Sequence, residues 1–393
     1  MAYRWFFGDL RTGKISRSID GSGTWSTSFD TADTLDFPFP LRSINEATGE
    51  YEWRFARGDS APARQYMAVA WVDDDEGVEE FIAGGPIWVR RYDRASAQLQ
   101  LTGAGLWSIF DRRLVMRALA AGANPAEGSR SYSARWLSLI AKRLLQDATT
   151  YMAGAELPIV FPDDASLGGS GSNHERNYPG YELGFVGERL RQLTEVQGGP
   201  EVQFMPRRRA DDRRYLEWVL RIGTPTTSMM LHQSGAPWVL DERVEESPIV
   251  DISIDEDGSQ MASRAFAAGQ GEAEGTPIAW GRNEQLVNEF GYPALDATVS
   301  TPTDTVSNMT TLQRHVASHL AWSDRPWETW DVEVDEQSFW RIAPSFRPGD
   351  WVRLEASGGD PYIVPGRYEM RALSASGGQG AVTISMSPRK AAI

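Results

Sequence analysis

The chain opens with short apolar runs separated by turn residues, a pattern typical of antiparallel strands. Residues 3–7 form an aromatic run, and residues 14–19 alternate apolar and polar side chains after a turn at Gly8. Residues 25–29 resume the extended pattern. Aromatic and β-branched runs between Gly, Asp and Ser indicate strands joined by hairpins. We therefore expect a sheet at the start of the chain, with partner strands supplied further along.

Residues 67–101 have the pattern expected of those partners. An apolar run at residues 67–72 is followed, after an acidic turn, by predicted strands at 79–82 and 87–92. Residues 98–101 then alternate apolar and polar side chains. This is the pattern of an antiparallel meander with one buried face and one solvated face.

A short helical segment at residues 106–110 marks a change in character, so we place a first β domain at residues 1–110. We predict an α+β insertion domain at residues 111–235. Its residues 133–152 carry apolar side chains at helical spacing, with Ser133 as the expected N-cap. The apolar positions of this helix are Trp136, Leu139, Ile140, Leu144 and Leu145.

The rest of the insertion combines a second helix with a hairpin. Residues 185–196 are the expected helix, and residues 201–205 and 215–222 are the expected strands of the hairpin. Residues 163–180 are polar and Gly-rich, which is typical of a loop.

Residues 236–393 return to strands and form the third predicted domain. One helix is expected at residues 304–321, capped by Asp304 or Ser307. The closing strands predict a small β-barrel or sandwich. The fold class is therefore mainly β, with two antiparallel β-barrel or sandwich domains flanking an α+β domain.

Composition narrows the classes of function. The 393 residues include 54 acidic and 39 basic side chains, for a net charge of −15. Such acidity argues against general affinity for nucleic acids or anionic membranes. The absence of cysteine excludes disulfides and thiolate metal sites. No apolar run reaches the roughly 18 residues of a membrane span, and the N-terminus lacks the features of a signal peptide.

No motif predicts catalysis, a cofactor or a metal. His315 and His319 lie four residues apart on a predicted helix, as two zinc ligands could, but Val316 stands where a zinc protease has glutamate. Ser170 and Ser172 lie in a Gly-rich loop without the preceding strand of a nucleophile elbow. The acidic pairs are typical of solvated turns. We predict amphipathic helix positions, a flexible loop and solvated turns respectively, and no enzyme.

One loop is strongly basic. Its arginines are accompanied by Asp211 and Asp212, which argues against a nucleic-acid site and favours a solvated hairpin tip or a subunit contact. The basic residues are Arg207, Arg208, Arg209, Arg213 and Arg214. The chain also has 15 tryptophans. We predict that they fill interfaces and cores, where aromatic side chains are enriched, and favour this over a platform that stacks on sugars.

Both ends of the chain resemble a known family. Residues 7–15 (FGDLRTGKI), Trp25 and residues 36–41 (DFPFPL) resemble the N-terminus of minor tail proteins of long-tailed actinobacterial phages. Residues 346–352, with the predicted strands that follow them, resemble the last barrel of phage baseplate-hub proteins. The arginine-rich usage, with lysines only at positions 14, 142 and 390, agrees with a GC-rich host.

The resemblance implies a structural protein of the virion tail tip. Its two flanking β domains would then be tube-like, and three copies would form a ring that continues the tail tube and pairs exposed sheet edges between subunits. Implied partners are the distal tail protein, the tape measure and the fibre or tip proteins, with DNA only passing through.

In such a ring the acidic side chains have a hypothetical role. Carboxylates that face the lumen would repel DNA phosphates, so that DNA passes without binding. The candidate lumen residues are Asp73, Asp74, Asp75, Asp255, Glu256 and Asp257. Two alternatives stay open: a tail-associated hydrolase of glycan or peptidoglycan, and a receptor-binding module that stacks aromatic side chains on sugars.

Overall fold

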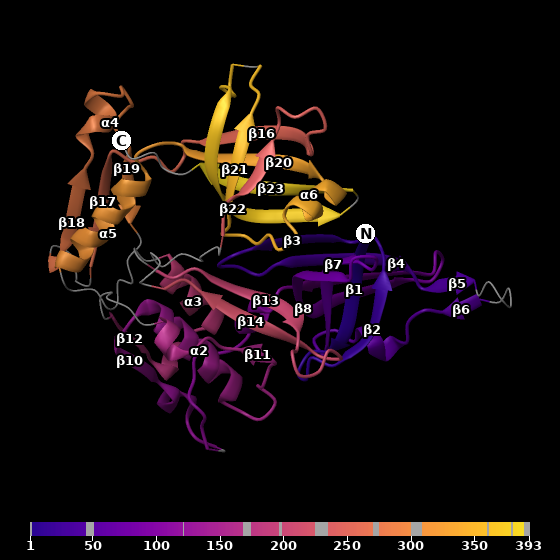
Figure 1. Cartoon of the computed structure of the whole chain (residues 1–393). Helices are drawn as coiled ribbons and strands as arrows, with labels where there is room; N and C mark the ends of the chain where they lie inside the picture. Colours follow the sequence, from indigo (N-terminus) through magenta and orange to yellow (C-terminus); the bar gives the residue numbers. More distant parts are fainter. Residues whose placement is uncertain are drawn as a thin grey trace. The chain divides into compact units, whose positions relative to one another are not determined.

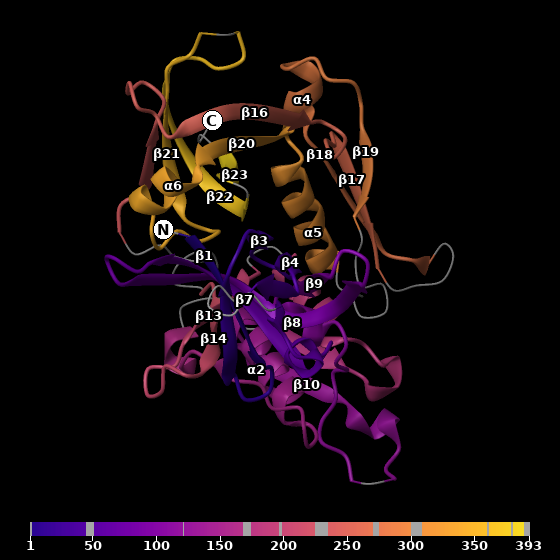
Figure 2. The same cartoon turned by 90° about the vertical axis from the view of Figure 1, so that its right-hand side faces the viewer.

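The computed structural model describes residues 2–44, 51–120, 122–167, 174–195, 199–224, 235–269, 275–299, 309–359, 361–378 and 380–388. The chain divides into two compact units (Figures 1 and 2). Unit 1 comprises Met1–Ile252 and Asp331–Ile393, and unit 2 is Ser253–Trp330. The predicted domain boundaries at residues 110 and 235 stay a prediction.

Unit 1 begins with the antiparallel sheet expected from the opening pattern. β1 (Ala2–Asp9) pairs with β2 (Ile15–Asp20) on one side and with β7 (Gln65–Asp73) on the other. Every residue of β7 is buried, which explains its nearly continuous apolar sequence. The prediction that residues 67–101 supply a partner for the first strand is confirmed by β7, which begins two residues earlier than predicted.

The next strand differs from the prediction. Instead of two strands, β8 (Val78–Asp93) runs for 16 residues, pairing first with β7 and then with β9 (Gln98–Ala104). The two glycines between the predicted strands, Gly84 and Gly85, lie inside β8 and allow close packing. A Cβ atom built on Gly85 would lie 2.1 Å from the carbonyl oxygen of Ala104.

The two ends of the chain meet in one sheet. β3 (Thr24–Ser28) pairs with β4 (Thr34–Pro40) and also with β22 (Gly366–Gly378), so indigo and yellow strands lie side by side in Figure 1. The described residues build a sheet of 13 strands in this way. The remaining elements of this part of the chain are β5 (Arg42–Ile44), β6 (Tyr51–Trp53), η1 (Arg57–Ser60), β15 (Trp238–Asp241), α6 (Glu336–Ile342), β21 (Trp351–Ala356) and β23 (Ala381–Pro388).

The middle segment confirms both predicted helices and the hairpin. α2 (Leu137–Thr150) and α3 (Val186–Thr194) pack in one apolar core, and β13 (Val202–Arg208) pairs with β14 (Leu216–Ile222). The other elements are α1 (Trp107–Phe110), η2 (Pro125–Gly128), β10 (Arg130–Arg135), β11 (Ile159–Val160), η3 (Asp164–Leu167), β12 (His174–Tyr178) and η4 (Gly180–Glu182).

Two local predictions in this segment are wrong. Ser133 lies in β10, and Trp136 is the N-cap of α2. Residues 174–178, expected to be loop, form β12 and pair with β10. β10 and β12 form a ribbon of only two strands, which leaves most side chains of β12 in contact with solvent. These side chains are therefore mostly polar, and only Tyr178 among them is buried. Ser170 and Ser172 lie outside the described residues.

Unit 2 is a small sheet covered by a helix. β17 (Arg264–Ala268) lies between β18 (Ile278–Arg282) and β19 (Asp296–Val299), and α5 (Met309–Trp322) packs along these strands (Figure 2). The helix expected at residues 304–321 is confirmed from Met309 onward, whereas Asp304 and Ser307 lie outside the described residues. α4 (Glu284–Asn288) follows β18.

β16 (Ile249–Asp257) and β20 (Trp327–Asp335) carry the chain from unit 1 into unit 2 and back. The mainly β fold with helices concentrated in the middle segment and in unit 2 agrees with the fold class predicted from the sequence. Among the helices of the described residues, none has the length and apolar character needed to cross a membrane.

Candidate functional site

The basic residues predicted from the sequence all lie on the hairpin of β13 and β14. Arg207 and Arg208 end β13, and the other three arginines lie in the turn. The backbone N–H of Arg209 donates to the carbonyl oxygen of Tyr215 at 2.9 Å, which closes the hairpin. The hairpin therefore gathers these side chains at one place in unit 1.

Carboxylates accompany every one of these arginines. Arg208 donates two hydrogen bonds to Glu79 of β8, at 2.5 and 2.9 Å, and Arg213 contacts the same carboxylate at 3.4 Å. Arg207 pairs with Glu217 at 2.8 Å. Glu79 thus ties the hairpin to the first sheet.

The tip of the hairpin is paired within itself. Arg209 lies 2.6 Å from Asp211, and Arg214 lies 2.7 Å from Asp212. Hydrogen bonds from Arg214 lower the pKa of Asp212 to about 2. The tip is consequently less basic than its arginine count suggests, and the choice between a solvated turn and a subunit contact stays a prediction.

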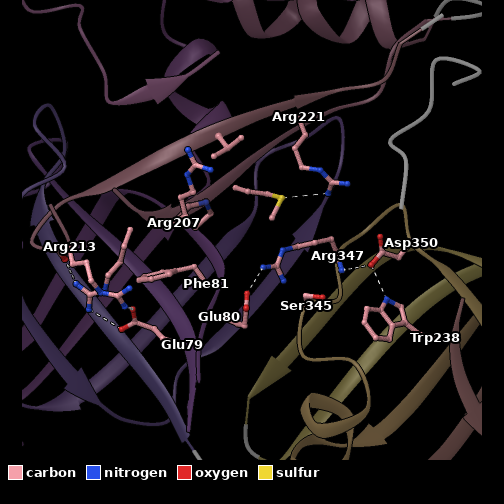
Figure 3. Close-up of a pocket in the computed structure, with 14 residues that line it drawn as sticks. Glu79, Glu80, Phe81, Arg207, Arg213, Arg221, Trp238, Ser345, Arg347 and Asp350 are labelled. Carbon is pink, nitrogen blue, oxygen red and sulfur yellow. Dashed lines mark hydrogen bonds and ion pairs between the residues drawn. The ribbon is translucent and has the colours of Figure 1, made fainter. Parts of the chain in front are cut away.

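Beside the hairpin lies a cavity of about 570 Å³ (Figure 3). Its walls come from β8, β13, β14, β15 and the turn at residues 345–350. The charged residues that line it are Glu79, Glu80, Arg207, Arg208, Arg213, Arg221, Arg347 and Asp350. Three of the five arginines predicted from the sequence therefore line a cavity that the sequence did not reveal.

Arg347 is the most deeply buried of the lining arginines, with 8% of its surface exposed. Its Nη2 donates to Glu80 at 3.2 Å, and its Nη1 donates to the carbonyl oxygen of Phe346 at 2.6 Å. Its Nε is buried and has no hydrogen-bond partner among the described residues. Burial lowers the pKa of Arg347, because a charged guanidinium is poorly solvated there.

Asp350 lies on the same turn as Arg347. Its carboxylate accepts a hydrogen bond from Trp238 Nε1 at 2.9 Å and another from the backbone N–H of Arg347 at 3.0 Å. Burial raises the pKa of Asp350 above its usual range. Arg221 donates to Gln203 at 2.9 Å, and burial lowers the pKa of Arg221.

The acidic residues predicted at 73–75 have distinct environments in unit 1. Asp73 is buried and accepts from the backbone N–H groups of Asp75 and Glu76, at 3.0 and 3.3 Å, so it shapes the turn after β7. Asp74 accepts two hydrogen bonds from Arg4 at 2.8 and 3.1 Å, and these lower the pKa of Asp74. Only Asp75 is a simple exposed carboxylate.

Asp255, Glu256 and Asp257 are exposed at the end of β16, and they belong to unit 2. Asp257 accepts from the backbone N–H of Ser259 at 2.7 Å. The two acidic groups thus lie in different units, and a role in lining a lumen stays a prediction for both.

The histidine pair belongs to α5 of unit 2. The ring of His319 meets the ring of Trp322 edge-on, with centroids 4.9 Å apart, and burial lowers the pKa of His319. Among the described residues, no group of three or more His, Asp or Glu side chains is placed to hold a metal ion.

Comparisons with known proteins identify the fold. No protein family description matches this chain, and no curated protein matches it. A tail protein from Neisseria meningitidis MC58 has a similar structure, with a TM-score of 0.56 and 13% sequence identity over 99% of this chain and 97% of that one. The chain has the fold of that tail protein.

A second solved structure extends the similarity. The 43 kDa tail protein of prophage MuSo2 from Shewanella oneidensis has a TM-score of 0.54 and 12% identity, over 98% of both chains. At such low identity the comparison shows a shared architecture and leaves residue roles open.

Proposed function

We propose that this chain is a structural protein of a phage tail tip, a hub that forms a ring and continues the tail tube towards the host. The observation that carries the proposal is the similarity of fold over nearly the full length of two tail proteins. Because the similarity covers nearly the whole of both chains, the proposal rests on the arrangement of the full chain and not on a single β domain.

The sheet itself supports assembly into a ring. β2 stands at one end of the strand order of the described residues. The backbone N–H of Ile15, at its start, donates to the carbonyl oxygen of Arg214 at 2.8 Å, and no further strand of the described residues pairs with the rest of its outer edge, where a strand of a neighbouring subunit can add. Rings remove such edges by pairing them between copies. We propose a homotrimer in the virion, of actinobacterial phage origin, with the distal tail protein, the tape measure and the fibre or tip proteins as neighbours.

In this proposal the ring attaches the tip proteins and provides the channel for genome ejection. DNA passes through it without being bound, because exposed carboxylates repel phosphates. The chain then works by assembly and carries out no reaction.

Electron cryo-microscopy of the intact particle tests the hub. A three-fold ring coaxial with the tail tube, with its sheets continuing the tube wall, is the expected result. A monomer, or a copy attached away from the axis, would overturn the hub and lead to assays of glycan binding and hydrolysis.

The lumen hypothesis has its own test. Phage carrying Asp255→Asn, Glu256→Gln and Asp257→Asn together should eject DNA more slowly, because the wall loses its repulsion. The control replaces Glu188, an exposed carboxylate on α3, with Gln. Unchanged ejection in the triple variant would refute the lumen role of residues 255–257 while leaving the ring intact.

A further inference from the structure

The cavity beside the hairpin of β13 and β14 brings together segments that are far apart in the sequence. β8 supplies Glu79 and Glu80, the hairpin supplies most of the arginines, and the turn at residues 345–350 closes the opposite side (Figure 3). All of these segments belong to unit 1.

Positive charge exceeds negative charge on the lining. Five arginines face three carboxylates. Glu79 is shared between Arg208 and Arg213, and Glu80 accepts from Arg347. Including Glu217, the partner of Arg207 outside the lining, still leaves an excess of one positive charge. Because charge is poorly screened at a partly buried site, this excess favours an anion in the cavity.

Arg347 supplies a donor that the described chain does not use. Its side chain is about nine-tenths buried. Its Nε has no acceptor within the described residues and is itself shielded from solvent, so an anion in the cavity would contact this guanidinium at its Nη atoms. Buried N–H groups in folded proteins almost always have a hydrogen-bond partner, because a buried N–H without one lowers the stability of the fold. The planar guanidinium matches the paired oxygens of a carboxylate or phosphate.

The size of the cavity agrees with a small ligand. Its volume of about 570 Å³ lies in the range typical of sites for small molecules. Phe81, Met205 and Trp238 add apolar surface between the charges, as ligand sites commonly do.

We propose that this cavity is a binding site for an oxyanion, a phosphate or carboxylate group that contacts Arg347 and the arginines of the hairpin. The oxyanion comes either from a free small molecule or from an acidic side chain of a neighbouring protein segment. The proposal does not depend on the role in the phage tail.

Isothermal titration calorimetry of the full chain with three probes tests the site: inorganic phosphate, citrate and a glutamate-rich peptide. We expect saturable binding of at least one probe. Stronger binding of the peptide assigns the oxyanion to an acidic protein segment, and stronger binding of phosphate or citrate assigns it to a free molecule.

Variants identify the cavity as the place of binding. Arg347→Gln should weaken binding by roughly tenfold or more, the value of a hydrogen bond to a charged group. Arg207→Gln should weaken it as well, and because Arg207 is exposed, this variant tests the site even where Arg347→Gln fails to fold. Arg11→Gln, an exposed arginine paired with Glu156 elsewhere in unit 1, is the matched control.

Binding of none of the three probes would overturn the proposal. Binding that Arg207→Gln and a folded Arg347→Gln leave at the parent affinity would overturn it too, because the anion would then lie elsewhere. Neither result would bear on the ring at the tail tip, which is tested by imaging.

Discussion

Trp71 of β7 stacks on Trp340 of α6, with ring centroids 5.9 Å apart and an angle of 23° between the rings. Trp340 Nε1 also donates to the hydroxyl of Tyr3 at 3.3 Å, and its ring packs against Trp25 at 6.0 Å. All four side chains are buried, with 5% or less of their surface exposed. The first strands of the chain and a helix near its end therefore share one aromatic core.

This shared core predicts a large effect of Trp340→Ala. The change removes a buried ring and leaves a cavity between the N-terminal and C-terminal strands, which should lower the free energy of unfolding by about 3–5 kcal/mol. Denaturant titration followed by circular dichroism measures the effect. Trp53→Ala, at a side chain that is 57% exposed, should cost under about 1 kcal/mol. Equal losses in both variants would contradict the shared core.

A buried ion pair predicts a second loss of stability. Arg371 of β22 donates two hydrogen bonds to Glu201, just before β13, and the two side chains are 8% and 12% exposed. Arg371→Met leaves the Glu201 carboxylate buried without this partner, which should cost about 3–5 kcal/mol.

The control for this pair is Arg11→Met, since Arg11 and Glu156 form an ion pair in which both side chains are 62% exposed. It should change stability by under about 1 kcal/mol. Thermal unfolding of both variants gives the comparison, and a loss no larger for Arg371→Met than for Arg11→Met would show that the buried pair adds little.

Asp33 predicts a pH dependence of stability. Burial raises the pKa of Asp33 to about 7, against 3.8 for the unfolded chain. As pH rises from about 4 to 7, the unfolded chain releases this proton while the folded chain keeps it, so this group makes the protein less stable over that window. Asp33→Asn replaces the titratable carboxyl group with an amide that does not titrate. The free energy of unfolding of this variant, relative to that of the parent, should rise by a few kcal/mol between about pH 4 and 7 and then level off.

Asp74→Asn is the control for the pH experiment. Hydrogen bonds from Arg4 lower the pKa of Asp74, so its titration falls below that window and its stability relative to the parent should stay flat from pH 4 to 7. Urea unfolding at a series of pH values measures both variants. A flat difference for Asp33→Asn would show that Asp33 ionises normally in the folded chain.

Gly85 predicts the effect of adding a single methyl group. A Cβ atom there would overlap the carbonyl oxygen of Ala104, which belongs to the backbone of β9 and cannot swing away. Gly85→Ala should therefore cost about 1–3 kcal/mol. Gly58→Ala is the matched change, because a Cβ atom built on Gly58 meets nothing within 4 Å. Differential scanning calorimetry of the two variants compares them, and equal melting temperatures would contradict the close approach of β8 and β9.

Part of the candidate site could be predicted from the sequence. The density of arginine at residues 207–214 predicted a basic hairpin, and its two strands were predicted from their alternation. Arg347 and Glu80 gave no such signal, because they are 267 residues apart and only their contact gives either a role in the cavity. Pairing across such a separation is set by the packing of the whole unit.

By itself the sequence determined the elements whose signal is local. Alternating side chains gave the strands, helical spacing gave α2, α3 and most of α5, and composition excluded disulfides. Tertiary structure decided what local pattern cannot contain: that β8 is one strand, that β12 is a strand at all, and that β22 pairs with β3. The physical reason is that strand pairing and buried ion pairs gain their energy from partners distant in the chain. The same local pattern is compatible with many such partners, and only the packed core selects one.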